Sequence, residues 1–222
     1  MELDHLRRIY RDYAPGYDDS MRLSERLLLD RCRRELLQKA RGDVLEVAIG
    51  TGIDLPYYPT GCRITGLDLV PEMLALAAAR ARTLKLPLCQ VIADVAQLPY
   101  PNGSFDTVVT TLAACTFPDP IAALREMGRV CREDGRVLLL EHVRGNSALF
   151  GRILDWLTPY TVASIGCNLN RDTAANAAIA GLRIMAVRAS FGGLLVQIEA
   201  QPAQKSQDTP AAHPGRSVEL AA

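Results

Sequence analysis

The sequence predicts an α/β fold, in which seven mostly parallel strands form one sheet with helices on both faces and the last two strands form an antiparallel hairpin. Short apolar runs alternate with helix-like patterns in units of about 20 to 40 residues, which is typical of parallel strands joined by right-handed crossovers. Several runs are apolar throughout, as expected for strands buried on both faces. The last two runs flank Phe191-Gly192-Gly193, a turn that favours a hairpin.

Helices are expected over the first 41 residues. Apolar residues recur at helical spacing in residues 2–12, and Pro15 and Gly16 are expected to end that helix. Ser24 can cap a second helix that extends to about residue 40. Its three central arginines, Arg31, Arg33 and Arg34, are expected to face solvent. We expect residues 1–41 to form a helical cap over the functional site.

The core is expected to span residues 42–200. After the opening strand, which begins just beyond Gly42, strands are predicted at 63–68, 88–94, 105–111, 135–142, 182–190 and 194–200. Helices are predicted at 71–84, 121–132, 147–158 and 172–180. Residues 201–222 contain three prolines and almost no large apolar side chains, so they are expected to be disordered.

Residues 144–171 interrupt the strand and helix alternation and are expected to form a lid-like insertion. The apolar residues of this insertion suit a cover that selects an apolar ligand. They could also do no more than cover one face of the sheet. The residues concerned are Phe150, Leu154, Trp156, Leu157 and Tyr160.

Composition limits the classes of function. The chain has 222 residues, enough for one sizeable domain. Its 25 basic and 25 acidic side chains balance, which disfavours a nucleic-acid partner. No apolar run approaches the roughly 20 residues of a membrane span, and the charged start does not resemble a signal peptide. The six cysteines form no CxxC pair and are expected to be buried thiols in a reducing cytoplasm.

The stretch from Val44 to Gly52 carries the clearest functional pattern, a buried strand that ends in a glycine turn. In an open parallel sheet, ligands bind beyond the carboxyl ends of the strands. Gly50, Gly52, Asp68 and Asp94 are therefore expected to line one groove. Asp68 follows Gly52 by 16 residues, about the offset at which an acid accepts hydrogen bonds from a ribose diol.

The details of this turn narrow the ligand to an adenosine without phosphates. A dinucleotide site favours a small residue three positions after Gly52, but Leu55 stands there. The sequence also lacks the GxxxxGK[ST] loop that binds nucleoside triphosphates. A nicotinamide-dependent oxidoreductase is therefore the least favoured of the functions considered.

Four ordered motifs resemble those of the class I S-adenosylmethionine-dependent methyltransferases. They are Leu45-Glu46-Val47-Ala48-Ile49-Gly50-Thr51-Gly52, Gly66-Leu67-Asp68-Leu69-Val70-Pro71-Glu72-Met73-Leu74, Ala93-Asp94-Val95-Ala96-Gln97-Leu98-Pro99 and Ser104-Phe105-Asp106. The resemblance covers about residues 10–201. It implies a Rossmann-like fold and S-adenosyl-L-methionine as the cofactor.

By that resemblance each motif has a role in binding S-adenosylmethionine. Asp68 would bind the ribose hydroxyls, Asp94 the adenine amino group, and Leu69 and Val95 the faces of the adenine ring. The methionine end would be held by the turn from Gly50 to Gly52 together with Glu46, Thr110 and Thr111, with Glu46 acting through water. The family usually has glycine at the position of Ala48, so some displacement is expected there.

Two further segments resemble subgroups of that family. The N-terminal Tyr13-Ala14-Pro15-Gly16-Tyr17-Asp18 resembles the ubiquinone and menaquinone C-methyltransferases and the bacterial phospholipid N-methyltransferases. The segments Glu141-His142-Val143 and Gly166-Cys167-Asn168-Leu169-Asn170-Arg171 are similar to the thiol S-methyltransferases. The acceptor is therefore expected to be a small, fairly apolar thiol, phenol or quinol, amine or lipid head group. A lipid acceptor would add a peripheral membrane contact.

Two residues are expected to be catalytic. His142 could deprotonate the acceptor, because the pKa of histidine lies near neutrality, or it could only orient the pocket. Tyr17 could close over the transferred methyl group or only pack against the sheet. Cys167 and Asn168 could touch the acceptor, although a free cysteine is more often a buried filler. No metal site is expected, because the three histidines are scattered along the chain. The alternative to an enzyme is a binding or regulatory module that keeps the fold without turnover.

Overall fold

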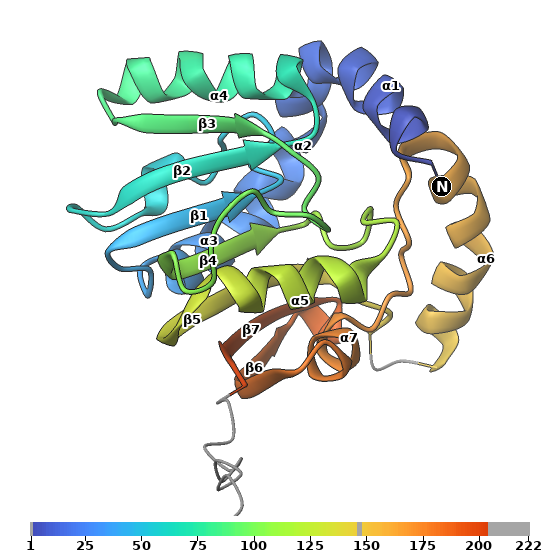
Figure 1. Ribbon diagram of the computed structural model, residues 1–222. Helices are drawn as coiled ribbons and strands as arrows, with labels where there is room; N and C mark the ends of the chain where they lie inside the picture. The colour runs from blue at the N-terminus through green and yellow to red at the C-terminus, as the bar shows by residue number, and fades with distance from the viewer. Residues whose placement is uncertain (1, 146–147, 204–222) are drawn as a thin grey trace, which may run out of the picture.

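We describe a computed structural model of the chain over residues 2–145 and 148–203. Seven strands form one sheet in the order β3-β2-β1-β4-β5-β7-β6 (Figure 1). Their bounds are β1 Asp43–Val47, β2 Arg63–Asp68, β3 Leu88–Ile92, β4 Phe105–Thr111, β5 Cys131–His142, β6 Leu182–Ser190 and β7 Leu195–Pro202. The first five pair in parallel, and β7 pairs antiparallel with both β5 and β6. The predicted fold class is confirmed.

Alternate residues of the central strands point to opposite faces of the sheet and bury separate cores. Leu45 and Val108 pack with α5 (Pro120–Val130) and α7 (Thr173–Ile179). Their neighbours Val44 and Val109 pack with α3 (Asp30–Leu37) on the other face. The helix α4 (Pro71–Leu84) covers β2 and β3 on that second face. This alternation explains why the strands read as continuous apolar runs.

The strands at the two edges of the sheet differ from this pattern. Most of β3 and most of β6 are exposed or half-exposed. Cys89 of β3 is exposed and Cys62 is half-buried, so the expectation that all six cysteines are buried was wrong for these two residues. For Cys89 the cause is position, because an edge strand lacks a neighbour on one side. Gln201 and Pro202, expected to be part of a disordered tail over residues 201–222, belong to β7, and residues 204–222 lie outside the described residues.

The N-terminal helices depart from the predicted boundaries. The helix α1 (Leu3–Tyr13) is followed at once by a 3₁₀ turn over Ala14–Gly16 and by α2 (Tyr17–Ser24). A π-helical turn, Glu25–Leu29, then leads into α3. Ser24 therefore lies inside a continuous helical path and caps nothing, and its hydroxyl donates to the carbonyl of Met21. Pro15 is accommodated because a proline is tolerated in the first turn of a helix.

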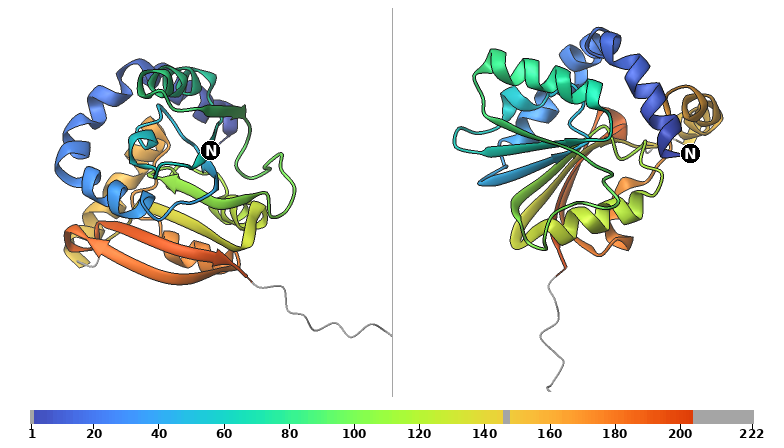
Figure 2. Two further views of the ribbon diagram at one scale, coloured as in Figure 1. Left: turned by 90° about the vertical axis from the view of Figure 1, so that its left-hand side faces the viewer. Right: turned by 45° about the horizontal axis from the view of Figure 1, so that its top comes forward.

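The insertion forms one long helix instead of a short helix and a loop. The helix α6 (Ala148–Ile165) continues through Pro159. It lies beside α1 at the carboxyl ends of the parallel strands, as two views show (Figures 1 and 2). Among the described residues, no helix has the length and apolar character needed to cross a membrane.

Candidate functional site

An open cavity lies at the carboxyl ends of the first four strands, with an empty volume of about 910 Å³ that includes its mouth. One wall follows the strands and is formed by residues 48–54, 67–70, 93–95 and 111–118 in part. The opposite wall comes from the N-terminal helices, through Leu3, Leu6, Tyr10, Tyr17 and Arg33. The cavity therefore has two walls, the strand-end wall and the helical wall.

The glycine turn after β1 forms the base of the strand-end wall. Gly50 and Gly52 have positive φ angles of 57° and 75°. A Cβ on Gly50 would meet nothing within 4 Å, so the backbone there is open to a ligand. A Cβ on Gly52 would come within 2.9 Å of Leu55 and 3.2 Å of Ala77. Gly50 thus exposes the turn to the cavity, whereas Gly52 allows the turn to pack against the protein.

Ala48, just before this turn, also has a positive φ angle, of 53°. The left-handed region costs a residue with a Cβ roughly 1–2 kcal/mol. The position is therefore strained for alanine and suits glycine. It also lines the cavity.

Two aspartates at the ends of β2 and β3 face the cavity. Asp68 Oδ2 accepts from the backbone N–H of Gly50 at 2.8 Å, and Oδ1 accepts from that of Val70 at 2.9 Å. Burial raises the pKa of Asp68, while its backbone hydrogen bonds act in the opposite direction. Asp94 Oδ1 accepts from the N–H of Ala96 at 2.9 Å. Both carboxylates keep lone pairs for a ligand, because each oxygen can accept about two hydrogen bonds.

The structure brings seven of the ten expected cofactor-binding residues to the cavity wall: Ala48, Gly50, Asp68, Leu69, Asp94, Val95 and Thr111. Gly52, Glu46 and Thr110 do not line it. Thr110 and Thr111 are consecutive in β4, so their side chains point to opposite faces of the sheet and only one can reach the cavity. Thr110 is fully buried on the other side.

Glu46 is buried away from the cavity wall. Its Oε2 accepts from the hydroxyl of Tyr58 at 2.8 Å. Burial and the neighbouring Asp54 raise the pKa of Glu46 well above its ordinary value. Asp54, rather than Glu46, presents a carboxylate to the cavity, and it is 1% exposed.

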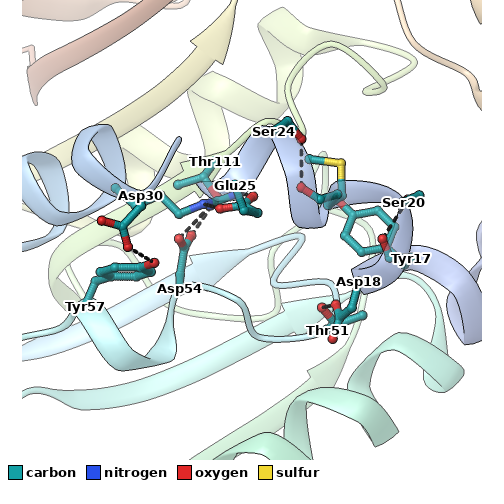
Figure 3. A network of polar contacts seen from close by, with 12 residues as sticks. Tyr17, Asp18, Ser20, Ser24, Glu25, Asp30, Thr51, Asp54, Tyr57 and Thr111 are labelled. Atoms are coloured by element: carbon teal, nitrogen blue, oxygen red, sulfur yellow. Dashed lines mark hydrogen bonds and ion pairs between the residues drawn. The ribbon is translucent and has the colours of Figure 1, made fainter. Parts of the chain in front are cut away.

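A buried ion network joins the two walls (Figure 3). Arg33 Nη1 donates to Asp54 Oδ1 and to Thr111 Oγ1, both at 2.6 Å. The same guanidinium pairs with Glu25 at 2.7 Å. Thr111 Oγ1 in turn lies 2.6 Å from Asp54 Oδ2. Burial opposes the charge on Arg33, but Asp54 and Glu25 raise its pKa above the ordinary value.

The expectation that Arg33 faces solvent was therefore wrong. Its exposure is 3%, whereas Arg31 and Arg34 on the same helix are exposed. Two acids supply the reason, since a buried guanidinium is retained only where it is paired and hydrogen-bonded. The partners are 8 and 21 residues away in sequence. Neither offset is a helical i, i+4 spacing, so the local pattern gave no signal.

Asp18 attaches α2 to the glycine turn, and its neighbour Tyr17 faces the cavity. Thr51 Oγ1 donates to Asp18 Oδ1 at 2.6 Å (Figure 3). Asp18 also pairs with Arg80 of α4. Tyr17 lines the cavity and stacks edge-on with Tyr13, with ring centroids 5.4 Å apart. Burial raises the pKa of Tyr17, so its hydroxyl stays protonated at neutral pH.

His142, at the end of β5, does not line the cavity. Its Nε2 lies 3.1 Å from Cys167 Sγ, and Cys167 Sγ lies 3.5 Å from Cys115 Sγ. The hydrogen bond with Cys115, followed by that with His142, lowers the pKa of Cys167. The bond with Cys167 and burial raise the pKa of Cys115. Burial opposes protonation of His142, but its contact with Cys167 raises its pKa.

Comparison with known proteins assigns the chain to a family. The family profile described as "Methyltransferase domain" matches residues 45–139. A phosphatidylethanolamine N-methyltransferase of Cereibacter sphaeroides is 38% identical over 146 residues, which cover 64% of this chain and 70% of that protein. A demethylmenaquinone methyltransferase of Deinococcus radiodurans is 33% identical over 178 residues, covering 77% and 73% of the two chains.

The chain belongs to the class I S-adenosylmethionine-dependent methyltransferases. Its fold agrees with that of a geranyl diphosphate C-methyltransferase of Streptomyces coelicolor in complex with S-adenosyl-L-homocysteine. That structure has a TM-score of 0.65 and 16% identity, and the match covers 85% of this chain and 84% of the other. Several other relatives are longer, and this methyltransferase spans 39 to 44% of their length.

The residues of this methyltransferase fit S-adenosylmethionine, the cofactor of the family. The strand-end wall presents two carboxylates for hydroxyl and amino donors, and Gly50 leaves the backbone open. The segment after the glycine turn is a 3₁₀ turn over Leu55–Tyr57, in which Leu55 is buried. A dinucleotide would need the N-terminus of a long helix there for its pyrophosphate. The described turn therefore suits an adenosine ligand without phosphates.

The helix α6, which forms most of the insertion over residues 144–171, lies further from the cavity than expected. Among the described residues of α6, none lines the cavity. Leu149, Ile153, Trp156 and Tyr160 form an exposed apolar stripe at helical spacing. The lid role of residues 144–171 stays a prediction. Tyr10 of α1 lines the cavity instead. The sequence did not predict this role, because Tyr10 occupies an apolar position of an amphipathic helix, as a core residue would.

Proposed function

We propose that this methyltransferase transfers the methyl group of S-adenosylmethionine to a small, largely apolar acceptor. The observation that carries the proposal is the contrast within one cavity. Beyond the two aspartates and the glycine turn, the cavity continues between α1 and the segment after β4. That part is lined by apolar and aromatic side chains: Leu6, Tyr10, Leu112, Ala113 and Phe117. Such a lining suits an apolar acceptor, with few polar groups to orient it.

The cofactor roles follow the two carboxylates. Asp68 is proposed to accept hydrogen bonds from the ribose hydroxyls, since its oxygens already anchor the turn on which the ligand would lie. Asp94 is proposed to accept from the adenine amino group, with Leu69 and Val95 against the ring. Gly50 and Ala48 are proposed to lie along the ligand backbone, and Gly52 to hold the turn closed from behind.

The methionine end is proposed to meet the ion network. Arg33 and Asp54 present a cationic and an anionic group to the cavity, and Thr111 bridges them. A zwitterionic amino acid carries the complementary pair of charges. Glu46, originally expected at this end, is proposed to act behind Asp54 through the same buried cluster, and Thr110 is proposed to have only a packing role.

When bound, S-adenosylmethionine supplies an electrophilic methyl group on a sulfonium centre. In-line transfer mainly requires that the protein align the acceptor and exclude water. Tyr17 and Tyr10 of the helical wall are proposed to do both, because both residues are half-buried and line the cavity. His142 is proposed to serve the acceptor side indirectly, through its contact with Cys167.

The acceptor atom is proposed to belong to a thiol, phenol or quinol, amine or lipid head group. The two relatives named above act on a quinone precursor and on a phospholipid, to judge by their names. For a lipid acceptor, the exposed stripe of α6 would supply a peripheral membrane contact. A cytoplasmic location is proposed from the six cysteines, all of them free thiols. No nucleic-acid partner is proposed.

Calorimetric titration with S-adenosylmethionine and its demethylated product tests the cofactor site. We expect micromolar binding of at least one. Asp68→Asn should weaken it by about 10-fold or more, because a hydrogen bond to a charged group contributes roughly 1.5–3 kcal/mol. The matched control is Asp134→Asn, at a residue with an 87% exposed side chain. No binding by the folded wild-type protein would overturn the proposal.

Incubation with isotope-labelled S-adenosylmethionine and a panel of thiols, quinols, phenols, amines and phospholipids tests the acceptor class. Label is expected in one class of apolar acceptor. Cofactor binding without label in any acceptor would favour the alternative of a binding or regulatory module. Label confined to strongly polar acceptors would contradict the apolar assignment.

A further inference from the structure

Three metal-ligand side chains that are far apart in sequence meet behind the cavity. Cys115 follows β4, His142 ends β5, and Cys167 follows α6. One ligand atom from each, the two Sγ atoms and an imidazole nitrogen, lies within 4.8 Å of the other two. Both cysteines are less than 10% exposed. This group is the Cys115–His142–Cys167 cluster.

The chain segments that carry the two thiols are fastened to each other. The backbone N–H and the side-chain amide of Asn168 both donate to the carbonyl of Cys115, at 3.1 and 2.9 Å. Thr161 Oγ1 donates to the carbonyl of Cys167 at 2.7 Å. Arg171 donates to two carbonyls of the segment around Cys115, those of Ala114 and Phe117. The positions of the sulfur atoms are thus set by contacts outside the cluster itself.

The spacing of the cluster matches a face of a tetrahedral zinc site. Zinc–sulfur bonds of roughly 2.3 Å and zinc–nitrogen bonds of roughly 2.0 Å place neighbouring ligand atoms about 3.5–3.8 Å apart. The two distances within the cluster, 3.5 Å between sulfurs and 3.1 Å between Cys167 Sγ and His142 Nε2, are each shorter than the corresponding tetrahedral distance by roughly 0.3–0.4 Å. A small outward relaxation would admit an ion.

The environment of His142 also matches that of a metal ligand. A ligating histidine commonly has a second hydrogen bond from its ring, to a carboxylate, a water or a backbone carbonyl. The backbone of Leu169 acts to raise the pKa of His142, as a hydrogen-bond acceptor beside the ring would. The imidazole itself is directed at Cys167 Sγ, 3.1 Å from Nε2.

We propose that Cys115, His142 and Cys167 bind one Zn²⁺ ion. Two thiolates would balance the charge of the ion, so a neutral unit would be buried. Three protein ligands leave the fourth tetrahedral position for water or another small ligand. This zinc site differs from the expectation of no metal site, which rested on the scattered positions of the three histidines in the sequence. It does not depend on the proposed methyl acceptor.

The ion would also fix one part of the cavity wall. Cys115 lies between Ala113 and Thr116, both of which line the cavity. Binding would tie this segment to the end of β5 and to the segment after α6. Loss of the ion is therefore expected to lower thermal stability.

Cobalt titration of the full-length protein tests the site. The protein is reduced with a phosphine, stripped with a chelator, and titrated anaerobically with Co²⁺, whose visible absorption reports tetrahedral geometry and thiolate ligation. We expect saturation at one equivalent, displacement of the cobalt spectrum by Zn²⁺, and a higher melting temperature with Zn²⁺. Cys115→Ser, Cys167→Ser and His142→Gln should each weaken Co²⁺ binding at least about tenfold.

The matched control is Cys131→Ser. Cys131 is equally buried, at 3% exposure, but lies outside the cluster. It should leave the cobalt spectrum unchanged. Far-ultraviolet circular dichroism and calorimetric binding of S-adenosylmethionine show whether each variant is folded. Cobalt uptake without methyl transfer would contradict only the proposed function. A reduced, folded wild-type protein without thiolate-to-cobalt bands, or folded cluster variants with unchanged spectra, would overturn the zinc site.

Discussion

The two walls of the cavity are built in different ways. The strand-end wall comes from short continuous motifs, in which a turn or an aspartate follows directly after its strand. The helical wall depends on side chains that meet partners far along the chain: Arg33 contacts Asp54 and Thr111, which are 21 and 78 residues away. A site formed by backbone turns can therefore be predicted from a local sequence pattern, whereas a site formed by a buried ion network cannot.

The largest effect is expected from Arg33→Met, which breaks the network between the walls. Removing one partner of a buried ion pair leaves uncompensated charge, so the free energy of unfolding should fall by about 3–5 kcal/mol. Affinity for S-adenosylmethionine should fall as well. Urea unfolding and calorimetry measure the two quantities.

Arg34→Met is the control on the same helix. Its partner is Asp30, and its side chain is 61% exposed. An exposed ion pair contributes about 1 kcal/mol or less, so this variant should unfold close to the wild type. If Arg33→Met and Arg34→Met lower the free energy of unfolding equally, the buried ion network contributes no more stability than an exposed ion pair.

Thr111→Val and Thr110→Val compare the face of β4 that lines the cavity with the opposite face of the same strand. Thr111→Val removes one hydrogen bond from Arg33 and one from Asp54, which stay bonded to each other, and should cost about 1–3 kcal/mol of stability. Within the described part of the chain, the hydroxyl of Thr110 has no hydrogen-bond partner. Thr110→Val should therefore be neutral or slightly stabilising.

Calorimetry distinguishes the two threonines further. Thr111→Val should weaken binding of S-adenosylmethionine, and Thr110→Val should leave it unchanged. Weaker binding in the Thr110 variant would show that β4 contributes to the site from both faces.

The smallest effect is expected from Ala48→Gly in the strand-end wall. Glycine relieves the left-handed strain of roughly 1–2 kcal/mol but costs about 0.5–1 kcal/mol through the greater backbone entropy of the unfolded state, so the net gain in stability should be at most about 1.5 kcal/mol. Removal of the Cβ from the cavity should strengthen binding of S-adenosylmethionine. Thermal melts and calorimetry measure both, and unchanged or weaker affinity would show that the methyl group does not crowd the ligand.

The sequence predicted most of the sheet because apolar runs and their turns are local signals. β2, β4, β6 and α4 begin and end at the predicted residues. β5 begins four residues earlier than predicted, at Cys131. Its charged first half gives no apolar pattern, and its pairing with β4 shifts register between Phe105 and Thr107. Tertiary pairing, rather than local composition, sets that end.

The side-chain clusters could not be predicted for a different reason. Arg33 occurs among other arginines, and nothing nearby indicates which of them is buried. Cys115 and Cys167 lie 52 residues apart, and only the completed sheet brings them to His142. Such contacts depend on how the helices and strands pack. The sequence alone predicted the helices and strands but not these contacts between them.

The π-helical turn over Glu25–Leu29 makes the length of the N-terminal segment part of the site. Along a regular α-helix, residues eight apart would be rotated by about 80° from each other. The wider turn winds more slowly, and Glu25 and Arg33 share one face and pair. A one-residue deletion within this turn would rotate the residues after it by about 100° around the helix axis, so that Arg33 would no longer face Glu25. Natural length variation should therefore be tolerated less here than at the exposed ends of the same helices.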